Sequence, residues 1–204
     1  MSLSRHDLSI IANNITPNSS VLDIGCSKGT LLEYLIKEKQ VDGRGIDLDR
    51  DSVSECVKKG LFVIQANADK DLAHYPDGCF DYVVSSQVLQ ATHQPFEVFQ
   101  EMMRISKKVI VSIPNFGNWK NRLYLSVNGK MPVTKELSYE WYETPNIHFC
   151  TVKDFKELCD KLGFAIDAEH YLSYNEPLSC FKRTISANFF CDKAVFILSN
   201  KHAH

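Results

Sequence analysis

The chain has 204 residues, of which 44% are hydrophobic and 24% charged, a composition that excludes an intrinsically disordered protein. Lys and Arg number 23 against 25 Asp and Glu, so the formal charge of −2 excludes a basic footprint at whole-chain level, and we expect no nucleic-acid partner. No apolar run approaches the roughly 18 residues of a bilayer span, so we expect no membrane association. The length fits one domain over residues 1–204.

Seven cysteines are scattered along the chain without a CxxC pair, and neither they nor the histidines show the paired spacing of a zinc site. We therefore predict no metal, and free thiols in a reducing compartment. The N-terminal residues lack the long apolar stretch of a secretory signal, which predicts a cytoplasmic protein.

In the first two-thirds of the chain, short β-branched runs alternate with helical patterns. Pro95 opens one of these helices and Pro114 stops the strand that follows it. This alternation predicts a parallel sheet with right-handed crossovers. The predicted strands are residues 20–24, a strand ending at 45–47, 61–64, 80–85 and 109–113, and the predicted helices are residues 30–39, 52–59 and 95–105.

The alternation breaks after Pro114. Residues 115–150 are rich in aromatic side chains and contain Gly and Pro, which predicts a long irregular lid or partner surface. Thr151 is the expected N-cap of a helix that ends at Gly163. The last two predicted strands, residues 164–172 and 187–198, flank a polar connection at residues 174–186. We therefore predict an α/β fold: a doubly wound, mainly parallel sheet of seven strands whose last strand is antiparallel.

The segment Val21-Leu-Asp-Ile-Gly-Cys-Ser-Lys-Gly29 lies where the first strand turns into the first helix. Glycines there let a ligand approach the backbone, and the helix N-terminus offers N–H donors to an anion. The segment fits neither the G-x-G-x-x-G dinucleotide fingerprint nor the P-loop. It reads D-x-G-x-x-x-G, and about twenty residues later Asp47 ends the second strand, where an acid accepts hydrogen bonds from ribose hydroxyls.

This combination resembles the class I S-adenosylmethionine-dependent methyltransferases. The resemblance implies S-adenosylmethionine as cofactor and S-adenosylhomocysteine as product, with Asp47 on the ribose and Leu48 against the adenine. A glycine usually stands where this chain has Ser27, so we expect a narrower pocket. The other cofactor-binding residues implied are Asp23, Gly25, Cys26, Ser27 and Gly29 around the amino-acid part, Asn67 and Ala68 at the adenine edge, and Ser86 and Gln87 over the methionine part.

Further segments resemble a smaller family, the methionine biosynthesis protein MetW family, which has the same fold. These segments are Phe80-Asp-Tyr-Val-Val-Ser-Ser-Gln-Val-Leu-Gln-Ala91, Ile113-Pro-Asn-Phe-Gly-Asn-Trp119, Met131-Pro-Val-Thr134 and Trp141-Tyr-Glu-Thr-Pro-Asn-Ile-His148. The resemblance implies a role in methionine biosynthesis beside a homoserine O-acyltransferase. Two functions stay open: methyl transfer to an unidentified small molecule, or a non-catalytic partner or cofactor-sensing regulator of that acyltransferase.

Methyl transfer from a sulfonium requires mainly an in-line approach in a dry pocket, with a general base only where the acceptor must lose a proton. His93, after the fourth strand, and His148, at the end of the lid, are the candidate bases. Tyr142 and Asn115 are candidate orienting groups. For both histidines a capping or purely structural role is the alternative, so the sequence leaves open whether the chain is an enzyme.

Overall fold

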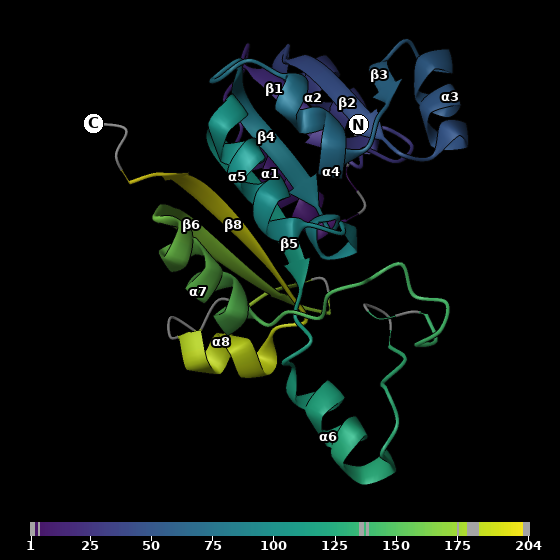
Figure 1. Cartoon of the computed structure of the whole chain (residues 1–204), viewed down its shortest axis with the longest axis vertical. Coiled ribbons are helices and arrows are strands. Elements are labelled where there is room, and N and C mark those ends of the chain that lie inside the picture. Colours follow the sequence, from purple (N-terminus) through teal and green to yellow (C-terminus); the bar gives the residue numbers. More distant parts are fainter. Residues whose placement is uncertain are drawn as a thin grey trace.

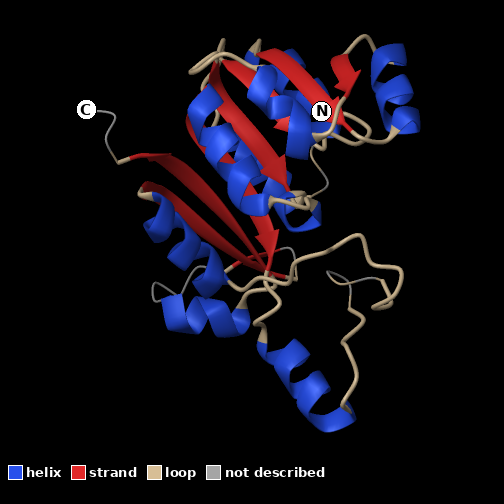
Figure 2. Cartoon of the chain, viewed as in Figure 1, coloured by secondary structure: helices blue, strands red, loops and turns tan. Residues whose placement is uncertain are grey.

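The computed structural model describes residue 3 and residues 5–134, 137, 139–174, 176–178 and 184–201. Within these ranges eight strands form one sheet in the order β3-β2-β1-β4-β5-β8-β6-β7 (Figures 1 and 2). The strands are β1 (Ser20–Ile24), β2 (Asp42–Asp47), β3 (Phe62–Gln65), β4 (Phe80–Ser86), β5 (Ser106–Pro114), β6 (Phe164–Ser173), β7 (Glu176–Pro177) and β8 (Lys193–Asn200). The helices are α1 (His6–Asn13), α2 (Thr30–Lys39), α3 (Arg50–Lys58), α4 (Ala68–Asp71), α5 (Pro95–Ile105), α6 (Trp119–Asn128), α7 (Val152–Leu162) and α8 (Thr184–Phe190), with 3-10 turns η1 (Leu72–His74) and η2 (Leu89–Ala91).

Strands β1 to β5 pair in parallel, whereas β8 is antiparallel to both β5 and β6. The predicted α/β class, with its mainly parallel sheet and antiparallel last strand, is therefore confirmed. The strand count was wrong by one, because the two-residue β7 pairs with the end of β6. The strand order reverses between β1 and β4, and sheets of this kind bind ligands at such a switch point, outside the carboxyl ends of the strands.

Alternate residues of the central strands point into two separate apolar layers. Leu22 of β1 and Phe196 of β8 pack with α5 and α7, whereas Val21 and Val195, one residue earlier, pack with α1 and α2. Both faces of the sheet are thus buried, which is why its strands read in sequence as nearly continuous apolar runs.

Residues 119–128 of the predicted irregular lid form helix α6. Asn118 caps its start by accepting the N–H of Lys120 at 2.9 Å, and Gly129, with a φ of 60°, ends it. Figure 2 shows α6 extending away from the sheet, and the loop that follows it returning towards the ends of the strands. None of the helices in the described ranges combines the length and the apolar character that a bilayer span requires.

The predicted last strand began too early, because residues 187–190 belong to α8 and β8 starts at Lys193. The side-chain amide of Asn115 donates to the carbonyl oxygens of Asn188 and Cys191, at 2.9 and 2.8 Å. The amide of Asn118 donates to the carbonyl oxygens of Phe190 and Cys191, both at 3.0 Å. These contacts occupy Asn115 in holding the turn between α8 and β8, rather than in orienting a substrate.

Candidate functional site

The turn after β1 has a left-handed backbone at three positions, with φ of 66° at Gly25, 48° at Ser27 and 71° at Gly29. A Cβ on Gly25 would lie 2.4 Å from Cγ2 of Val88, and one on Gly29 would lie 2.4 Å from Cδ1 of Leu61. Both glycines are therefore required by backbone conformation and by close packing. Ser27 takes the same kind of conformation with its side chain exposed.

Asp47, at the carboxyl end of β2, holds this turn in place. Its Oδ2 accepts the N–H of Ser27 at 2.7 Å, and its Oδ1 accepts the N–H of Asp49 at 2.9 Å. The N–H of Gly25 donates to the carbonyl oxygen of Ile46 at 2.8 Å. A carboxylate offers about four acceptor positions, so Asp47 can still receive two hydrogen bonds from a ligand.

A cavity of about 450 Å³ opens beside the turn, at the carboxyl ends of β1, β2 and β3. Its volume lies within the range of small-molecule sites, roughly 300–1,000 Å³. Five of the predicted cofactor residues line it, namely Gly25, Asp47, Leu48, Asn67 and Ala68. The remaining lining residues were missed by the sequence analysis: Ile24, Ile46, Asp49, Ala66, Asp69, Val88, Ala91, Thr92 and Pro145.

Some of the missed residues had a signal in the sequence and others had none. Asp49 stands two positions after Asp47, and Val88 directly follows Gln87, which the resemblance assigned to the cofactor. Pro145 enters from the loop after α6. Its place is fixed by Gln90, whose carbonyl oxygen accepts the N–H groups of Ile147 and His148, both at 3.0 Å. No spacing rule connects those two segments.

Hydrogen bonds from backbone N–H groups hold the polar side chains of the cavity wall. Asn67 caps α4 by accepting the N–H of Asp69 at 2.9 Å, and the carboxylate of Asp69 accepts the N–H of Gln94 at 2.8 Å. Ala68, between them, places only a methyl group at the cavity. The side chains of Asn67 and Asp69 are therefore held in place at the cavity, with the small Ala68 between them.

Three predicted residues of the glycine turn do not line the cavity. Cys26 and Gly29 are buried, and burial raises the pKa of the Cys26 thiol, which keeps it protonated and unreactive. Ser27 is exposed and directs its backbone N–H to Asp47. The expectation that Ser27 narrows the cofactor pocket stays a prediction, since Ser27 does not line this cavity.

Asp23, the fourth residue of β1, is only 3% exposed. Burial and the negative charge of Asp47 raise its pKa to about 7, while the positive charge of Arg5 acts in the opposite direction. In the neutral range this carboxyl is consequently divided between its protonated and ionised forms.

Ser86 and Gln87, at the end of β4, contact residues at the start of the chain that the sequence analysis did not single out. Nη2 of Arg5 donates to Oγ of Ser86 at 3.1 Å, and Nε2 of Gln87 donates to Oδ2 of Asp7 at 3.1 Å. Burial acts to raise the pKa of Asp7, but the hydrogen bond from Arg5 and the charge of Lys193 lower it below its ordinary value. A buried carboxylate with two cations thus lies beside the predicted methionine subsite.

The two candidate bases, His93 and His148, are both exposed, and neither lines the cavity. His93 directly follows Thr92, which does line it, and His148 lies three residues after Pro145. Both histidines thus neighbour lining residues along the chain without lining the cavity themselves. Tyr142 is 66% exposed. Roles for these three side chains in catalysis stay predictions.

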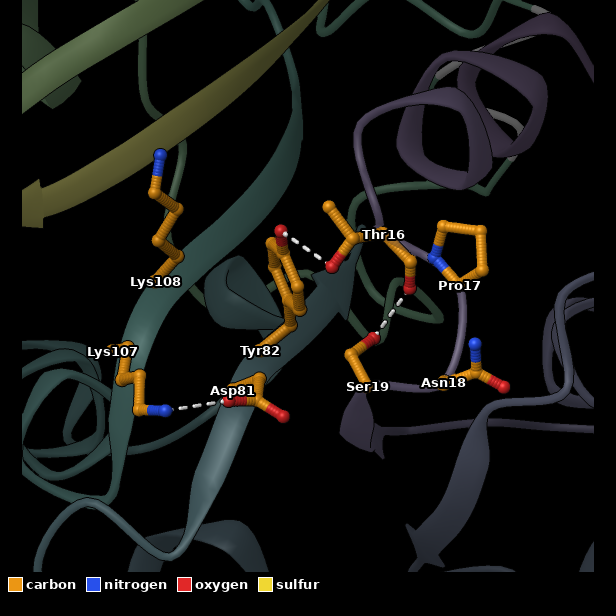
Figure 3. A pocket seen from close by; sticks show the side chains of 8 residues that line it. All are labelled: Thr16, Pro17, Asn18, Ser19, Asp81, Tyr82, Lys107 and Lys108. Carbon is orange, nitrogen blue, oxygen red and sulfur yellow. Dashed lines mark hydrogen bonds and ion pairs between the residues drawn. The ribbon is translucent and has the colours of Figure 1, made fainter.

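A second hollow of about 270 Å³ lies at the opposite, amino ends of β1, β4 and β5 (Figure 3). Its charged groups are already paired: Lys107 donates to Asp81 at 2.8 Å, and Lys108 lies 3.1 Å from Asp167. The hydrogen bonds from Lys107 and Ser20 lower the pKa of Asp81 to about 2. This hollow therefore has a structural explanation.

Comparisons with known proteins agree with this geometry. The sequence model of the family described as methionine biosynthesis protein MetW matches residues 5–198. Over 164 residues, 76% of the chain, the sequence is 30% identical to the bifunctional methionine biosynthesis protein MetXA/MetW of Rhodopirellula baltica, but it spans only 26% of that protein's length.

Similar folds occur among solved structures. A complex between the Haloferax volcanii Trm112 methyltransferase activator and a putative methyltransferase gives a TM-score of 0.71 at 15% identity, covering 98% of this chain and 90% of that one. A SAM-dependent methyltransferase of Archaeoglobus fulgidus gives 0.65 at 19% identity, covering 95% and 91%. At these identities the likeness shows the fold alone.

Proposed function

Since the chain belongs to the family of the methionine biosynthesis protein MetW, we propose that it binds S-adenosylmethionine and transfers the methyl group to a small molecule in methionine biosynthesis. One observation carries the proposal: the Asp47 carboxylate, beside the left-handed turn at Gly25, faces a cavity at the switch point of the sheet. An acid in that position suits a ribose diol.

The residues that line the cavity fit an adenosine group. Asp47 has acceptor positions left for the ribose hydroxyls, and Leu48, which is 67% exposed, can cover one face of a purine. Asn67 and Ala68 lie in the connection after β3, and both line the cavity. Ile24, Ile46 and Val88 supply the apolar surface against which a base packs.

The cofactor would supply an activated methyl group, so the chain has to bind, orient and exclude water. The loop after α6, fixed to Gln90 by two backbone hydrogen bonds, places Pro145 over the cavity and can shield it from solvent. We propose His93 and His148 as the groups that accept the acceptor's proton, since both are exposed and follow lining residues, Thr92 and Pro145, along the chain. The product would be S-adenosylhomocysteine.

Calorimetric titration with S-adenosylmethionine and S-adenosylhomocysteine tests cofactor binding. Asp47→Ala should weaken binding by at least about tenfold, because a hydrogen-bonded charged acceptor is lost. Asp42→Ala, at the other end of the same strand, is the matched control and should bind as the wild type does. The proposal fails if folded wild-type protein binds neither nucleoside, or if Asp47→Ala binds unchanged.

Asp47 also holds the turn, so a second variant separates binding from folding. Leu48 is exposed and lines the cavity, and Leu48→Ala should weaken binding several-fold at an unchanged Tm. Val57, on α3, is 56% exposed and does not line the cavity, so Val57→Ala serves as its control. Equal affinities in these two variants would argue against an adenine at Leu48.

Turnover is tested by incubating the chain with methyl-labelled S-adenosylmethionine and a low-molecular-mass metabolite fraction. Label in a new small molecule, lost in Asp47→Ala, supports methyl transfer. Persistent absence of product from protein that binds the cofactor would leave binding intact and refute the transferase function.

A second candidate function is that of a non-catalytic partner or cofactor-sensing regulator of a homoserine O-acyltransferase. It is favoured by the bifunctional MetXA/MetW relative, whose name joins two proteins in one chain. Helix α6 and the loop after it offer a surface for such a partner, since Trp141 is 70% and Val127 72% exposed. Co-purification and the rate of the acyltransferase with and without this chain test the idea. If there is neither association nor a change in rate, it is wrong.

A further inference from the structure

We infer that two copies of this chain associate through the edge strand β3 (Phe62–Gln65), which pairs antiparallel with β3 of the second copy and joins the two sheets into one. The inference goes beyond the proposed function. β3 is the last strand at its edge of the sheet, and among the described residues no strand pairs with its outer side (Figure 1). An edge of this kind presents N–H and C=O groups that another strand can bind.

The backbone groups that face outwards belong to Val63 and Gln65. The N–H of Ala66, directly after the strand, donates to the carbonyl oxygen of Asp47 on β2 at 3.0 Å. Successive residues of a strand direct their N–H groups to opposite sides, so those of Val63 and Gln65 point away from β2. A second strand at this edge can therefore exchange hydrogen bonds with both residues.

One face of β3 carries exposed apolar side chains. Phe62 and Ile64 are two residues apart, hence on the same face, and they are 71% and 50% exposed. The connection after β3 forms only the four-residue α4 and the turn η1, and both side chains stay exposed beside it. Cζ of Arg44, which is opposite Phe62 on β2, lies 6.0 Å from the centre of the phenyl ring. The ring is therefore supported in a position where a partner strand can contact it.

The symmetry of a dimer selects one register of the two strands. A two-fold axis perpendicular to the sheet keeps equivalent faces on the same side, so residues directly opposite each other must lie on the same face of their own strands. In the register centred on Val63, this residue lies opposite Val63 of the second copy, and the two exchange both of their outward hydrogen bonds. Phe62 then lies opposite Ile64 of the second copy, and Ile64 opposite Phe62. The dimer gains two pairs of an aromatic with a β-branched side chain, a stabilising combination across strands.

The charges at the two ends of β3 favour a second copy in the antiparallel orientation. Lys58 and Lys59 precede the strand, whereas Asp69 and Asp71 follow it. Antiparallel pairing brings the lysines of each copy beside the aspartates of the other, and symmetry makes this occur twice. Parallel pairing would bring like charges together. The edge is therefore complementary to itself in one orientation.

Sedimentation velocity over a range of protein concentrations tests the association. A single strand pair makes a small interface, so the dimer should be of the transient class and populated at concentrations on the order of 100 μM. Ile64→Lys should raise the dissociation constant at least about tenfold, because both cross-strand pairs are lost and a charge enters the edge. Leu123→Lys, at a 54% exposed position of α6, is the matched control and should associate as the wild type does.

Wild-type protein that stays monomeric throughout this range overturns the inference. A dimer that persists in folded Ile64→Lys protein also overturns it, and loss of association in Leu123→Lys alone would assign the interface to α6 instead. Circular dichroism shows whether each variant is folded. These outcomes are separate from cofactor binding, because neither Ile64 nor Leu123 lines the cavity.

Disulfide cross-linking tests the register without relying on the lysine variant. In the register centred on Val63, the Cα atoms of residue 62 and of residue 64 in the second copy lie about 4.5 Å apart, within the roughly 4.4–6.8 Å that a disulfide spans. The double variant Phe62→Cys/Ile64→Cys should therefore form a covalent dimer under mild oxidation. Each single variant should give no more dimer than the wild type, whose native cysteines set the background. Absence of a covalent dimer from the double variant, or a dimer from Ile64→Cys alone, would refute this pairing.

Discussion

Replacing Gly25 by alanine measures how strongly the structure demands a glycine at the cofactor turn. A left-handed backbone, φ of 66°, costs a residue with a Cβ about 1–2 kcal/mol. The new methyl group would also lie 2.4 Å from Cγ2 of Val88, and overpacking costs a further ~1–3 kcal/mol. We therefore expect the free energy of unfolding to fall by about 2–5 kcal/mol, from the sum of the two costs.

Val88→Ala separates the two costs, because it removes both Cγ atoms that the new methyl group would meet. In that background Gly25→Ala should cost only the ~1–2 kcal/mol of the backbone. Gly78→Ala is the matched control, since Gly78 has a φ of 60° and nothing within 4 Å of an added Cβ. Urea titrations followed by circular dichroism measure all four variants. A penalty for Gly25→Ala that is equal in both backgrounds, or no larger than that of Gly78→Ala, would refute the reasoning.

Three further predictions follow from single residues. The pKa of Asp23 is raised to about 7 in the folded chain, so the free energy of unfolding should fall as pH rises from about 4 to 7. At ~1.4 kcal/mol per pKa unit the fall amounts to up to about 4 kcal/mol. Urea titrations across that pH range should show that Asp23→Asn removes it. An unchanged pH profile would count against it. Ser27→Gly should raise the free energy of unfolding by about 0.5–1 kcal/mol, because relief of the left-handed serine, about 1–2 kcal/mol, exceeds the roughly 0.5–1 kcal/mol that the greater freedom of glycine in the unfolded chain costs; thermal denaturation showing a loss would contradict this. Asn118→Ala should cost about 2–4 kcal/mol, because it removes the cap of α6 and strands buried carbonyl groups, whereas the exposed Asn128→Ala should cost little. Equal melting temperatures for the two asparagine variants would disprove that account.

The core of the cofactor site could be predicted because it is built from neighbouring parallel strands. In the register of β1 and β2, Asp23 pairs with Gly45 and Ile24 with Ile46, so the glycine turn and Asp47 emerge side by side. Consecutive strands that pair in this way carry their loops to one edge of the sheet. A motif after each strand is then enough to assemble Gly25, Asp47 and Asn67 around one cavity.

The errors in the predicted elements have local causes. The run at residues 187–198 is apolar throughout most of its length, and short apolar runs do not distinguish helix from strand. The packed amides of Asn115 and Asn118 fix the turn after Phe190, so the first part becomes α8. Helix α6 did have signals, an Asn cap and a Gly stop, but the aromatic composition around them concealed its pattern.

The sequence by itself determined the doubly wound sheet, the left-handed turn at Gly25 and the acid at Asp47, because strand periodicity, backbone freedom and strand-end position are local properties. Only the tertiary structure decided what surrounds them. Arg5 reaches Ser86 across 81 residues of sequence, and Pro145 reaches the cavity through Gln90. Contacts between remote segments are set by the packing of whole elements, and no spacing along the chain records them.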